Sequence, residues 1–344
     1  MKAAIFRKHG GTDELEVAEV AQPVAQAGEV VLRVRAAALN HLDLWVRRGL
    51  PGIEIRLPHI GGSDIAGEVV EIGAGVEGVT EGARVVVNPG LWDGTCEWCR
   101  KGEHSLCVNY RIIGEHTDGG FAEYTAVPAA NLAAIPDGFS FEEAAAVPLV
   151  FLTAWRALMT QARLRAGESI LILGASGGAA SASIQIAKLA GARVYAVTSS
   201  EEKAAQARAL GADEVIDRTK EDFAKEVFKR TNRRGVDVVL ENTGEETWEG
   251  SLRALARGGR LVTYGGTTGP NGNTNIPLLF WKQIQIIGST MGTADEFATV
   301  MRLVWERRLR PVVDRVLPLE QIKEAHETLE AGEQFGKIVL TPQV

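Results

Sequence analysis

All three cysteines of the chain lie close together, in a stretch whose residue types suit metal binding. Two residues separate Cys96 from Cys99, and seven separate Cys99 from Cys107. Reduced thiolates at such spacings bind zinc, and three thiolates leave a tetrahedral zinc one ligand short. Asp93 precedes Cys96 by three residues and its carboxylate could complete the set. Two alternatives stay open: Glu97, Glu103 or His104 supplies the fourth ligand, or the loop binds nothing.

A second stretch has the residue types of a phosphate-binding turn. The apolar run 169–173 is followed by glycines at 174, 177 and 178, and then by apolar residues at helical spacing through 190. A strand, a glycine-rich turn and a helix in this order allow a dinucleotide pyrophosphate to meet free backbone N–H groups. An ordinary turn is the alternative. We expect the pyrophosphate to face Gly174, Ser176, Gly177, Gly178 and Ala179.

The elements that must position this turn form a regular series. Short apolar runs recur at 192–197, 214–217, 236–240, 260–264 and 284–287, with helix-like stretches at 201–212 and 247–258 between them. Such alternation predicts an α/β fold with a doubly wound parallel sheet. Ligands bind at the carboxyl ends of such strands. The ribose and nicotinamide should therefore meet the residues that end the fourth and fifth strands, which are Asn242, Thr243, Gly244, Gly265, Gly266 and Thr267.

Length and composition agree with a two-domain enzyme. The chain has 344 residues, 45% of them hydrophobic, which is enough for two cores. A net charge of −7 without a basic block argues against nucleic acid or an anionic membrane as a partner. The longest apolar stretch is too short to span a bilayer and no signal peptide opens the chain. We expect a cytoplasmic protein with reduced cysteines that acts on a small molecule.

Several segments, taken in order, resemble one family. MKAAIFRKHG, GGSDIAGEVVEIGAGV, the cysteine stretch, DGGFAEYTAVP, GASGGAA and FGKIVLTP follow one another as in the medium-chain dehydrogenase/reductase superfamily. The resemblance implies a GroES-like, mainly β catalytic domain at 1–150, a Rossmann dinucleotide domain at 151–294, and a segment at 295–344 that returns to the catalytic domain.

The chain departs from the zinc-dependent alcohol dehydrogenases of this family. Their catalytic zinc ligands fall here at Asn40, at Ser63 and Asp64 in place of His-Glu, and at Leu149. Amide, hydroxyl and leucine side chains do not replace thiolate or imidazole, so we expect no catalytic zinc. The alternative is a rearranged site around Asp64 with His41 or His59. On a strand, His41 would point away from the face of Asn40.

The pattern Asn40-x-x-Asp43 instead resembles the quinone oxidoreductase and zeta-crystallin branch. There, the Asn is placed to hydrogen-bond the cofactor or the substrate carbonyl, and Asp43 would fix the local turn. Trp45 stands where many members carry Tyr, so a proton would come from solvent. Members of that branch usually lack the cysteine stretch, which makes this chain a mixed type.

The residues that follow the predicted strand 192–197, the second of the series after 169–173, bear on whether the cofactor is NAD or NADP. No acid stands there to bind the adenosine ribose of NAD. Thr198, Ser199 and Lys203 offer hydroxyls and a cation to a 2′-phosphate, which favours NADP(H) over NAD(H). Thr153 resembles the family position near the nicotinamide amide. Trp92, Phe280 and Trp281 could form apolar walls for a substrate, or belong to a core or an interface.

The sequence thus predicts hydride transfer between NAD(P)H and a small apolar enone, quinone or carbonyl, without catalytic zinc and with one structural zinc. Two other functions stay open. One is an alcohol dehydrogenase with a rearranged catalytic zinc, and the other is a non-enzymatic, NADPH-binding protein like zeta-crystallin. The segment 281–290 resembles the edge strand that pairs two cofactor domains in relatives, so we expect a homodimer or homotetramer.

Overall fold

The structure is a computed structural model that describes residues 1–342. Its contacts divide the chain into two compact units, one of residues 1–150 with 292–344 and the other of residues 151–291. The chain therefore re-enters the first unit at Gly292, slightly before the boundary of 295 expected from the sequence.

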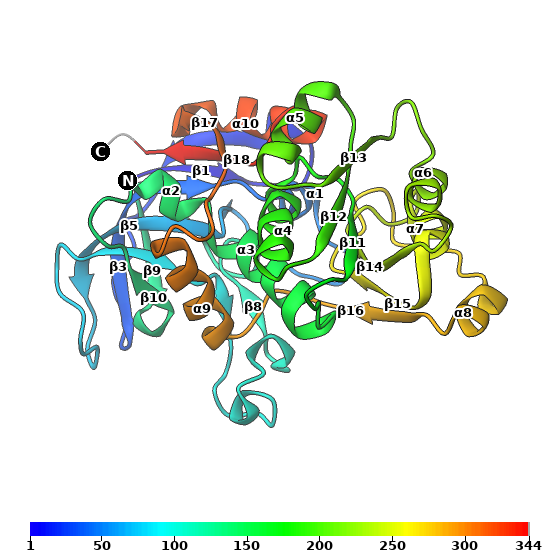
Figure 1. The fold of residues 1–344 in the computed structure, drawn as a ribbon. Helices are drawn as coiled ribbons and strands as arrows, with labels where there is room; N and C mark the ends of the chain where they lie inside the picture. The colour runs from blue at the N-terminus through cyan, green and yellow to red at the C-terminus, as the bar shows by residue number, and fades with distance from the viewer. Residues whose placement is uncertain (343–344) are drawn as a thin grey trace. The chain divides into compact units, whose positions relative to one another are not determined.

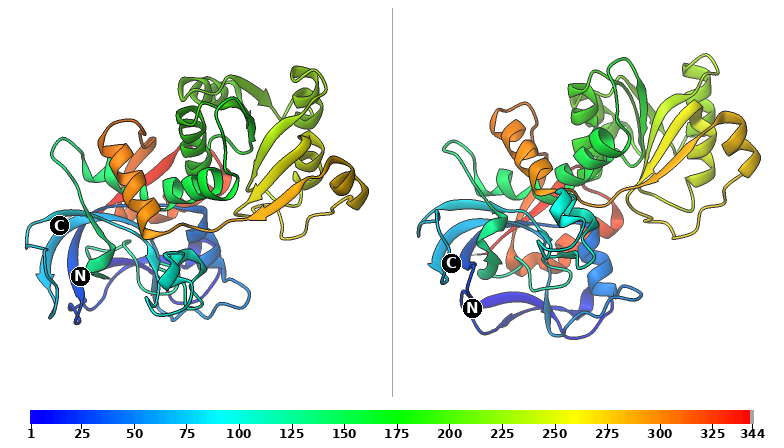
Figure 2. Two further views of the ribbon diagram at one scale, coloured as in Figure 1. Left: turned by 60° about the horizontal axis from the view of Figure 1, so that its bottom comes forward. Right: turned by 90° about the horizontal axis from the view of Figure 1, so that it is seen from below.

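The second unit is a doubly wound α/β domain. Six parallel strands lie in the order β13-β12-β11-β14-β15-β16, and helices cover both faces of the sheet (Figures 1 and 2). The order reverses between β11 and β14, which makes their carboxyl ends the place for a ligand. The strands are β11 (Ser169–Ile172), β12 (Arg193–Thr198), β13 (Glu214–Asp217), β14 (Val236–Glu241), β15 (Leu255–Thr263) and β16 (Gln285–Gly288); the helices are α4 (Gly178–Leu189), α5 (Glu201–Ala209), α6 (Phe223–Arg230), α7 (Trp248–Ala254) and α8 (Ile276–Lys282).

The doubly wound fold expected from the sequence is confirmed, with one error in an element. The stretch 247–258 was expected to be helical throughout, but α7 ends at Ala254 and β15 begins at Leu255. Leu255 pairs with Val236 across a bulge, and Gly258 has a φ of +71°. Because glycine is a poor helix former and pairing with β14 satisfies the backbone, strand geometry prevails over the helical periodicity here.

The first unit is mainly β. Its largest sheet has the order β10-β6-β5-β3-β18-β17, with β9 also paired to β3, and a smaller sheet has the order β2-β1-β4. The core lies between these strands and α10, and it includes Val30, Leu32 and Val34 of β3, which are fully buried. The strands are β1 (Lys2–Phe6), β2 (Leu15–Glu19), β3 (Glu29–Ala38), β4 (His59–Ile60), β5 (Asp64–Ile72), β6 (Arg84–Val87), β7 (Gly90–Leu91), β8 (Arg111–Ile112), β9 (Tyr124–Pro128), β10 (Leu132–Ala134), β17 (Val313–Pro318) and β18 (Lys337–Thr341); the helices are α1 (His41–Arg48), α2 (Phe141–Ala145), α9 (Ala294–Trp305) and α10 (Ile322–Ala331). Helix α3 (Pro148–Trp155) begins in the first unit and continues into the second, which starts at Phe151.

Three neighbouring strands of this sheet bring distant parts of the sequence together. Ala38 at the end of β3 pairs with Asp64 at the start of β5 on one side, and with Val339 of β18 on the other. Asn40 follows β3, and Lys337 is the first residue of β18. The sheet therefore places Asn40, Asp64 and Lys337 side by side, although nearly 300 positions separate the first from the last.

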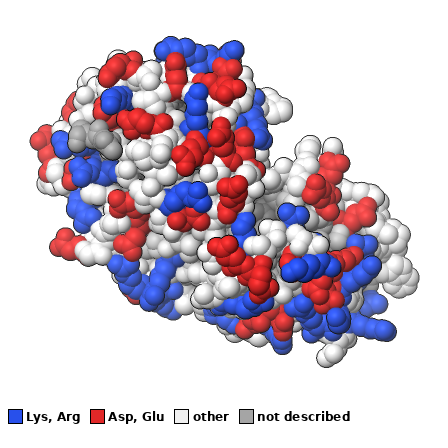
Figure 3. Space-filling model, turned by 90° about the horizontal axis from the view of Figure 1, so that it is seen from above, with Lys and Arg blue, Asp and Glu red and all other residues white. Residues whose placement is uncertain are grey.

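Charge is mixed over the surface. Acidic and basic side chains are interspersed on the face shown in Figure 3. Ion pairs such as Lys188–Asp213 and Arg193–Glu214 join the two signs on the second unit. Such a mixture differs from the single-sign surfaces that attract nucleic acids. No helix among residues 1–342 is long and apolar enough to cross a membrane.

Candidate functional site

Asn40, Asp64 and Lys337 form a buried cluster in the first unit, which we call the ammonium cluster. Lys337 Nζ donates to Asn40 Oδ1 at 2.6 Å and to Asp64 Oδ2 at 2.8 Å. Asn40 Nδ2 donates to the same Asp64 oxygen at 3.0 Å. All three residues are buried, Asp64 completely. A carboxylate without exposure to water needs such a partner, because burying an unpaired charge costs several kcal/mol or more.

The second oxygen of Asp64 is also engaged. Asp64 Oδ1 accepts from the backbone N–H of Leu149 at 2.8 Å, in the first turn of α3. A carboxylate is stabilised there because the first N–H groups of a helix have no partner within the helix. Leu149, which stands at the third expected zinc-ligand position, thus contributes its backbone to the cluster.

Asp43 fixes the turn that carries Asn40. Asn40 is the N-cap of α1, and Asp43 Oδ2 accepts from its backbone N–H at 2.7 Å in a capping box. Asp43 Oδ1 accepts from the N–H of Gly62 at 3.1 Å. Burial raises the pKa of Asp43 to about 7, although both N–H groups and the nearby Lys337 act in the opposite direction. The two bonds tie the start of α1 to the segment that precedes Asp64.

Among the described residues, neither histidine of the alternative rearranged zinc site, His41 or His59, belongs to a group of potential metal ligands with Asp64. His41 is the first residue of α1, not part of a strand, because the capping box turns the chain into a helix directly after Asn40. Its ring lies 5.4 Å from that of Trp45. His59 Nε2 lies 3.0 Å from the carbonyl oxygen of Gly114, and burial lowers the pKa of His59. The Oγ of Ser63, at the position of the family's histidine, is buried without a hydrogen-bond partner among the described residues.

His116 likewise has a local role. Its Nδ1 accepts from the backbone N–H of Ile112 at 3.1 Å. Its carboxylate neighbour Glu115 is buried, and burial raises the pKa of Glu115 to about 7. These contacts stabilise a turn in the first unit.

The glycine-rich turn lies where the neighbouring strands β11 and β14 end. Gly174 follows β11 with a φ of +58°, which favours glycine, and an added Cβ would lie 3.7 Å from Asn242 Oδ1 at the end of β14. That amide oxygen is buried and has no hydrogen-bond partner among residues 1–342. No side chain caps α4, which begins at Gly178. Free N–H groups at a helix start and an unpartnered amide beside them suit a dinucleotide pyrophosphate.

A buried carboxylate that the sequence reasoning missed shapes the neighbouring turn. Glu241 ends β14 without exposure to solvent and accepts from the backbone N–H groups of Thr243 at 2.8 Å and Gly244 at 3.1 Å. The hydroxyls of Thr247 and Ser251 also donate to it. These bonds hold the turn that presents Asn242 and Thr243. An acid that ends an apolar strand, followed by Asn-Thr-Gly, was the signal available in the sequence.

The turn after β15 approaches the same place. A Cβ on Gly265 would lie 3.3 Å from the carbonyl oxygen of Asn242, and one on Gly266 would lie 2.9 Å from that of Gly269 in the same turn. Glycine at 265 therefore favours close approach to the backbone after β14, and glycine at 266 allows the turn itself to be compact. Thr153 is also buried in this unit, with its hydroxyl 3.8 Å from the sulfur of Met291.

The end of β12 presents hydroxyls and nearby cations. Ser200 caps α5 by accepting from the backbone N–H of Lys203 at 3.3 Å. Thr198 is buried and Ser199 is half-buried. Arg218, which the sequence reasoning missed, donates its backbone N–H to the carbonyl oxygen of Thr198 at 3.0 Å. Arg218 therefore follows β13 immediately beside the end of β12.

Two of the aromatic residues considered as substrate walls lie at the surface of the second unit. Phe280 and Trp281 on α8 are 59% and 69% exposed, so they are not part of its core. Trp92 packs on the ring of His104, with centroids 4.5 Å apart.

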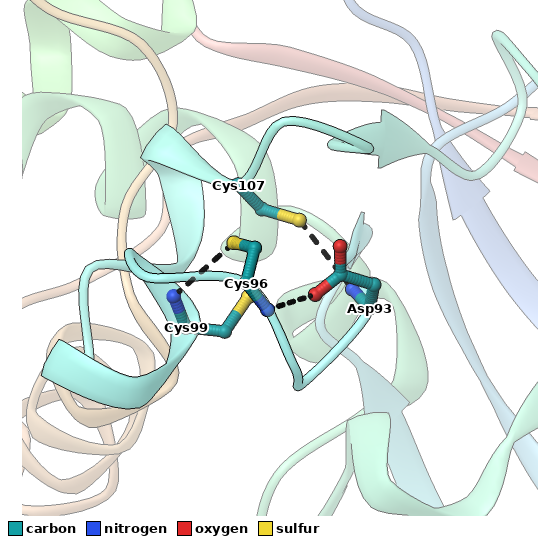
Figure 4. Close-up of side chains that lie close together, drawn as sticks. All are labelled: Asp93, Cys96, Cys99 and Cys107. Atoms are coloured by element: carbon teal, nitrogen blue, oxygen red, sulfur yellow. Dashed lines mark hydrogen bonds between the residues drawn. The ribbon is translucent and has the colours of Figure 1, made fainter.

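The segment Asp93–Cys107, which we call the cysteine loop, gathers the expected metal ligands. One ligand atom from each of Asp93, Cys96, Cys99 and Cys107 lies within 4.8 Å of all the others (Figure 4). Backbone N–H groups donate to two of the sulfurs, from Asp93 to Cys107 at 3.4 Å and from Cys99 to Cys96 at 3.5 Å. No disulfide joins these cysteines. Three thiols and a carboxylate within tetrahedral reach are a donor set that suits zinc.

The alternative fourth ligands have other partners. Glu97 pairs with Lys101 at 3.4 Å, and His104 Nδ1 accepts from the backbone N–H of Ala294 at 3.2 Å. Glu103 is likewise outside the ligand group. Asp93 itself is oriented by the backbone N–H of Cys96 at 2.9 Å and by Asn109 Nδ2 at 2.9 Å.

The similarity to known proteins extends over nearly the whole chain. Residues 26–137 match the alcohol dehydrogenase GroES-like domain, and residues 178–306 match the zinc-binding dehydrogenase domain. An acryloyl-coenzyme A reductase of Metallosphaera sedula is 36% identical over 99% of this chain and all of its own length. A solved NAD-dependent alcohol dehydrogenase is 46% identical, with a TM-score of 0.95 and 99% of both chains covered. A crotonyl-CoA carboxylase/reductase solved in complex with NADP is 27% identical, with a TM-score of 0.91, covering 99% of this chain and 94% of its own.

Proposed function

Because the chain belongs to the medium-chain dehydrogenase/reductase superfamily and is an NAD(P)-dependent oxidoreductase, we propose that it reduces an activated carbon–carbon double bond without a catalytic zinc. The observation that carries this proposal is the ammonium cluster. Both oxygens of Asp64 are engaged, and the Lys337 ammonium binds the residue at the first zinc-ligand position. A buried cation beside amide and carboxylate oxygens repels a metal ion, and among the described residues Asp64 belongs to no group of potential metal ligands with a thiolate or an imidazole.

The acceptor we propose is a small α,β-unsaturated thioester or enone. Acryloyl-CoA, in the name of one relative, and crotonyl-CoA, in that of another, both have a double bond conjugated to a carbonyl. Quinones share this chemistry and remain within the class. The relatives named alcohol dehydrogenases support the second candidate, in which a rearranged zinc activates an alcohol. The alternative of a non-enzymatic, NADPH-binding protein is set aside, since the chain is an oxidoreductase.

The bound nicotinamide supplies the hydride in this reaction. We propose that Gly174, Ser176, Gly177, Gly178 and Ala179 hold the pyrophosphate, with Thr153, Asn242, Thr243, Gly265 and Gly266 along the ribose and nicotinamide. The unpartnered Asn242 Oδ1 supports this assignment, since a ligand hydroxyl there would donate to it. Asp43 positions Asn40. A proton from solvent bonds to the α-carbon of the product.

We propose that NADP(H) is preferred over NAD(H). Thr198 and Ser199 offer hydroxyls at the end of β12, and Lys203 and Arg218 bring positive charge to the 2′-phosphate. The preference is measured as the ratio of kcat/KM for NADPH and NADH. Replacing both cations, as Lys203→Gln with Arg218→Gln, should lower kcat/KM for NADPH and leave that for NADH nearly unchanged.

We also propose one structural zinc in the cysteine loop and a homodimer or homotetramer in the cytoplasm. Asp93, Cys96, Cys99 and Cys107 leave no open position for water, as in structural sites. For assembly, β16 is an edge strand, and Ile276, Phe280, Trp281 and Ile286 are exposed large apolar side chains on it or on α8. Light scattering of the wild type and of Trp281→Glu tests whether this surface joins copies.

The experiment that tests the function combines metal analysis with a substrate panel. Zinc per chain is measured in purified wild type and in Cys99→Ser, and NADPH oxidation is followed with acryloyl-CoA, crotonyl-CoA, a small enone, a quinone and an aldehyde. We expect one zinc, absent from the variant, and reduction of a conjugated acceptor. A second zinc that survives in Cys99→Ser, together with NAD(P)⁺-dependent oxidation of alcohols, would establish the alcohol dehydrogenase alternative instead.

A further inference from the structure

We propose that the Lys337 ammonium is the electrophile of this enzyme, donating a hydrogen bond to the carbonyl oxygen of the acceptor as negative charge develops on it. This inference rests on the proposed function and assigns to one side chain the task that zinc performs in the zinc-dependent relatives. Lys337 then touches the reacting group, while Asn40 and Asp64 position it.

The number of N–H donors of Lys337 that lack a partner supports its role as the electrophile. An ammonium has three N–H donors, and those of Lys337 have two partners among residues 1–342, Asn40 Oδ1 and Asp64 Oδ2. The third N–H therefore has no partner among those residues. A buried ammonium with a spare donor is a strong site for an oxygen that becomes negative, because charge-assisted hydrogen bonds are the stronger ones.

Asn40, the donor expected from the sequence, has less to offer. Its Oδ1 accepts from Lys337, which fixes the orientation of the amide. Its Nδ2 donates to Asp64 at 3.0 Å and, more weakly, towards the carbonyl oxygen of Ala38 at 3.5 Å. Both amide hydrogens are thus directed at protein acceptors. Asn40 holds the ammonium in place from one side, as Asp64 does from the other.

The electrostatics fit the chemistry of a conjugated acceptor. When a hydride bonds to the β-carbon, the π electron pair of the double bond moves towards the carbonyl oxygen, and a solvent proton then bonds to the α-carbon. Lys337 keeps its proton throughout and stabilises the intermediate negative charge. A fixed donor in a site with little water stabilises such charge far more than it would in bulk water.

The test compares two variants that share a neutral residue at position 64. Asp64→Asn keeps the ammonium, whereas Asp64→Asn with Lys337→Met removes it without leaving an unpaired buried carboxylate. In single-turnover reduction of a small enone, the double variant should be slower than Asp64→Asn by about 100-fold or more, the usual effect of losing one oxyanion donor. Apparent enone affinity should change little. Asp64→Asn with Lys337→Arg keeps the charge and should recover part of the rate.

A spectroscopic measurement separates this role from a structural one. The infrared carbonyl stretch of a ¹³C=O-labelled enone bound with NADP⁺ should lie at lower frequency in Asp64→Asn than in the double variant, because a donor at the oxygen weakens that bond. NADPH fluorescence and thermal unfolding show that both variants fold and bind cofactor. Equal rates and equal stretches in the two variants would overturn the role of Lys337. A wild type that reduces no conjugated acceptor would instead refute the proposed function.

Discussion

The cysteine loop and the ammonium cluster hold charge in opposite ways. In the loop, three thiols and the carboxylate of Asp93 face one another across 4.8 Å or less. In the cluster, the carboxylate of Asp64 already has a cation, the ammonium of Lys337 at 2.8 Å. The first arrangement suits an added metal ion, and in our proposal the second takes the place of one. The two proposals are independent of each other, because separate parts of the first unit build the two sites.

The strongest test of the difference between the two sites is to remove the Lys337 ammonium alone. Lys337→Met should lower the free energy of unfolding by about 3–5 kcal/mol, because it leaves the fully buried Asp64 without its charge partner. Adding Asp64→Asn should recover most of that loss, since the amide oxygen can still accept from Leu149. Urea unfolding of the two variants and the wild type measures both changes. A Lys337→Met protein as stable as the wild type would show that the carboxylate does not depend on the ammonium.

The capping box beside the cluster should make stability depend on pH. The pKa of Asp43 is about 7 in the folded protein and about 4 when unfolded, so the folded state binds the proton more tightly between these values. The contribution of Asp43 to the free energy of unfolding is fully present below pH 4 and is lost as the pH rises through 7. The loss amounts to roughly 4 kcal/mol at most.

The matched control for this effect is Asp43→Asn, which cannot titrate. Between pH 4 and pH 7, the unfolding free energy of the wild type should fall relative to that of the variant. Chemical denaturation at closely spaced pH values measures the difference. If the difference rises with pH instead, the two backbone N–H groups outweigh burial and the pKa of Asp43 lies below its ordinary value.

Sites built from residues that are close in the sequence could be predicted, whereas the site built from distant residues could not. The ligands of the cysteine loop lie within fifteen positions, so their spacing alone indicated a metal site. The parallel sheet was predictable for the same reason, since most of its strands and helices are indicated by local apolar runs and helical periodicity. Lys337 was not singled out, because its partners Asn40 and Asp64 meet it only through the pairing of β5, β3 and β18. The one local signal was a lysine at the start of the apolar run 338–340.

A smaller effect should sharpen the metal side of the comparison. Asn109 Nδ2 donates to Asp93 Oδ2 at 2.9 Å and so orients the carboxylate among the thiols. Asn109→Ala should weaken zinc binding by about tenfold, the lower end for losing a hydrogen bond to a metal ligand. Competition with a chromogenic chelator measures the affinity. Enone reduction should stay unchanged, whereas a parallel loss of both would tie the loop zinc to the chemistry.

The smallest expected effect concerns Ser63, which stands where zinc-dependent relatives carry a histidine ligand. Its Oγ is completely buried and has no hydrogen-bond partner among the described residues. Removing an unsatisfied buried hydroxyl relieves a desolvation cost, so Ser63→Ala should leave the protein as stable or stabilise it by up to about 1 kcal/mol. Zinc content should not change, because the ammonium next to Asp64 already supplies the positive charge there. A variant that lost zinc or several kcal/mol would mean that Ser63 binds a group which its surroundings do not otherwise require.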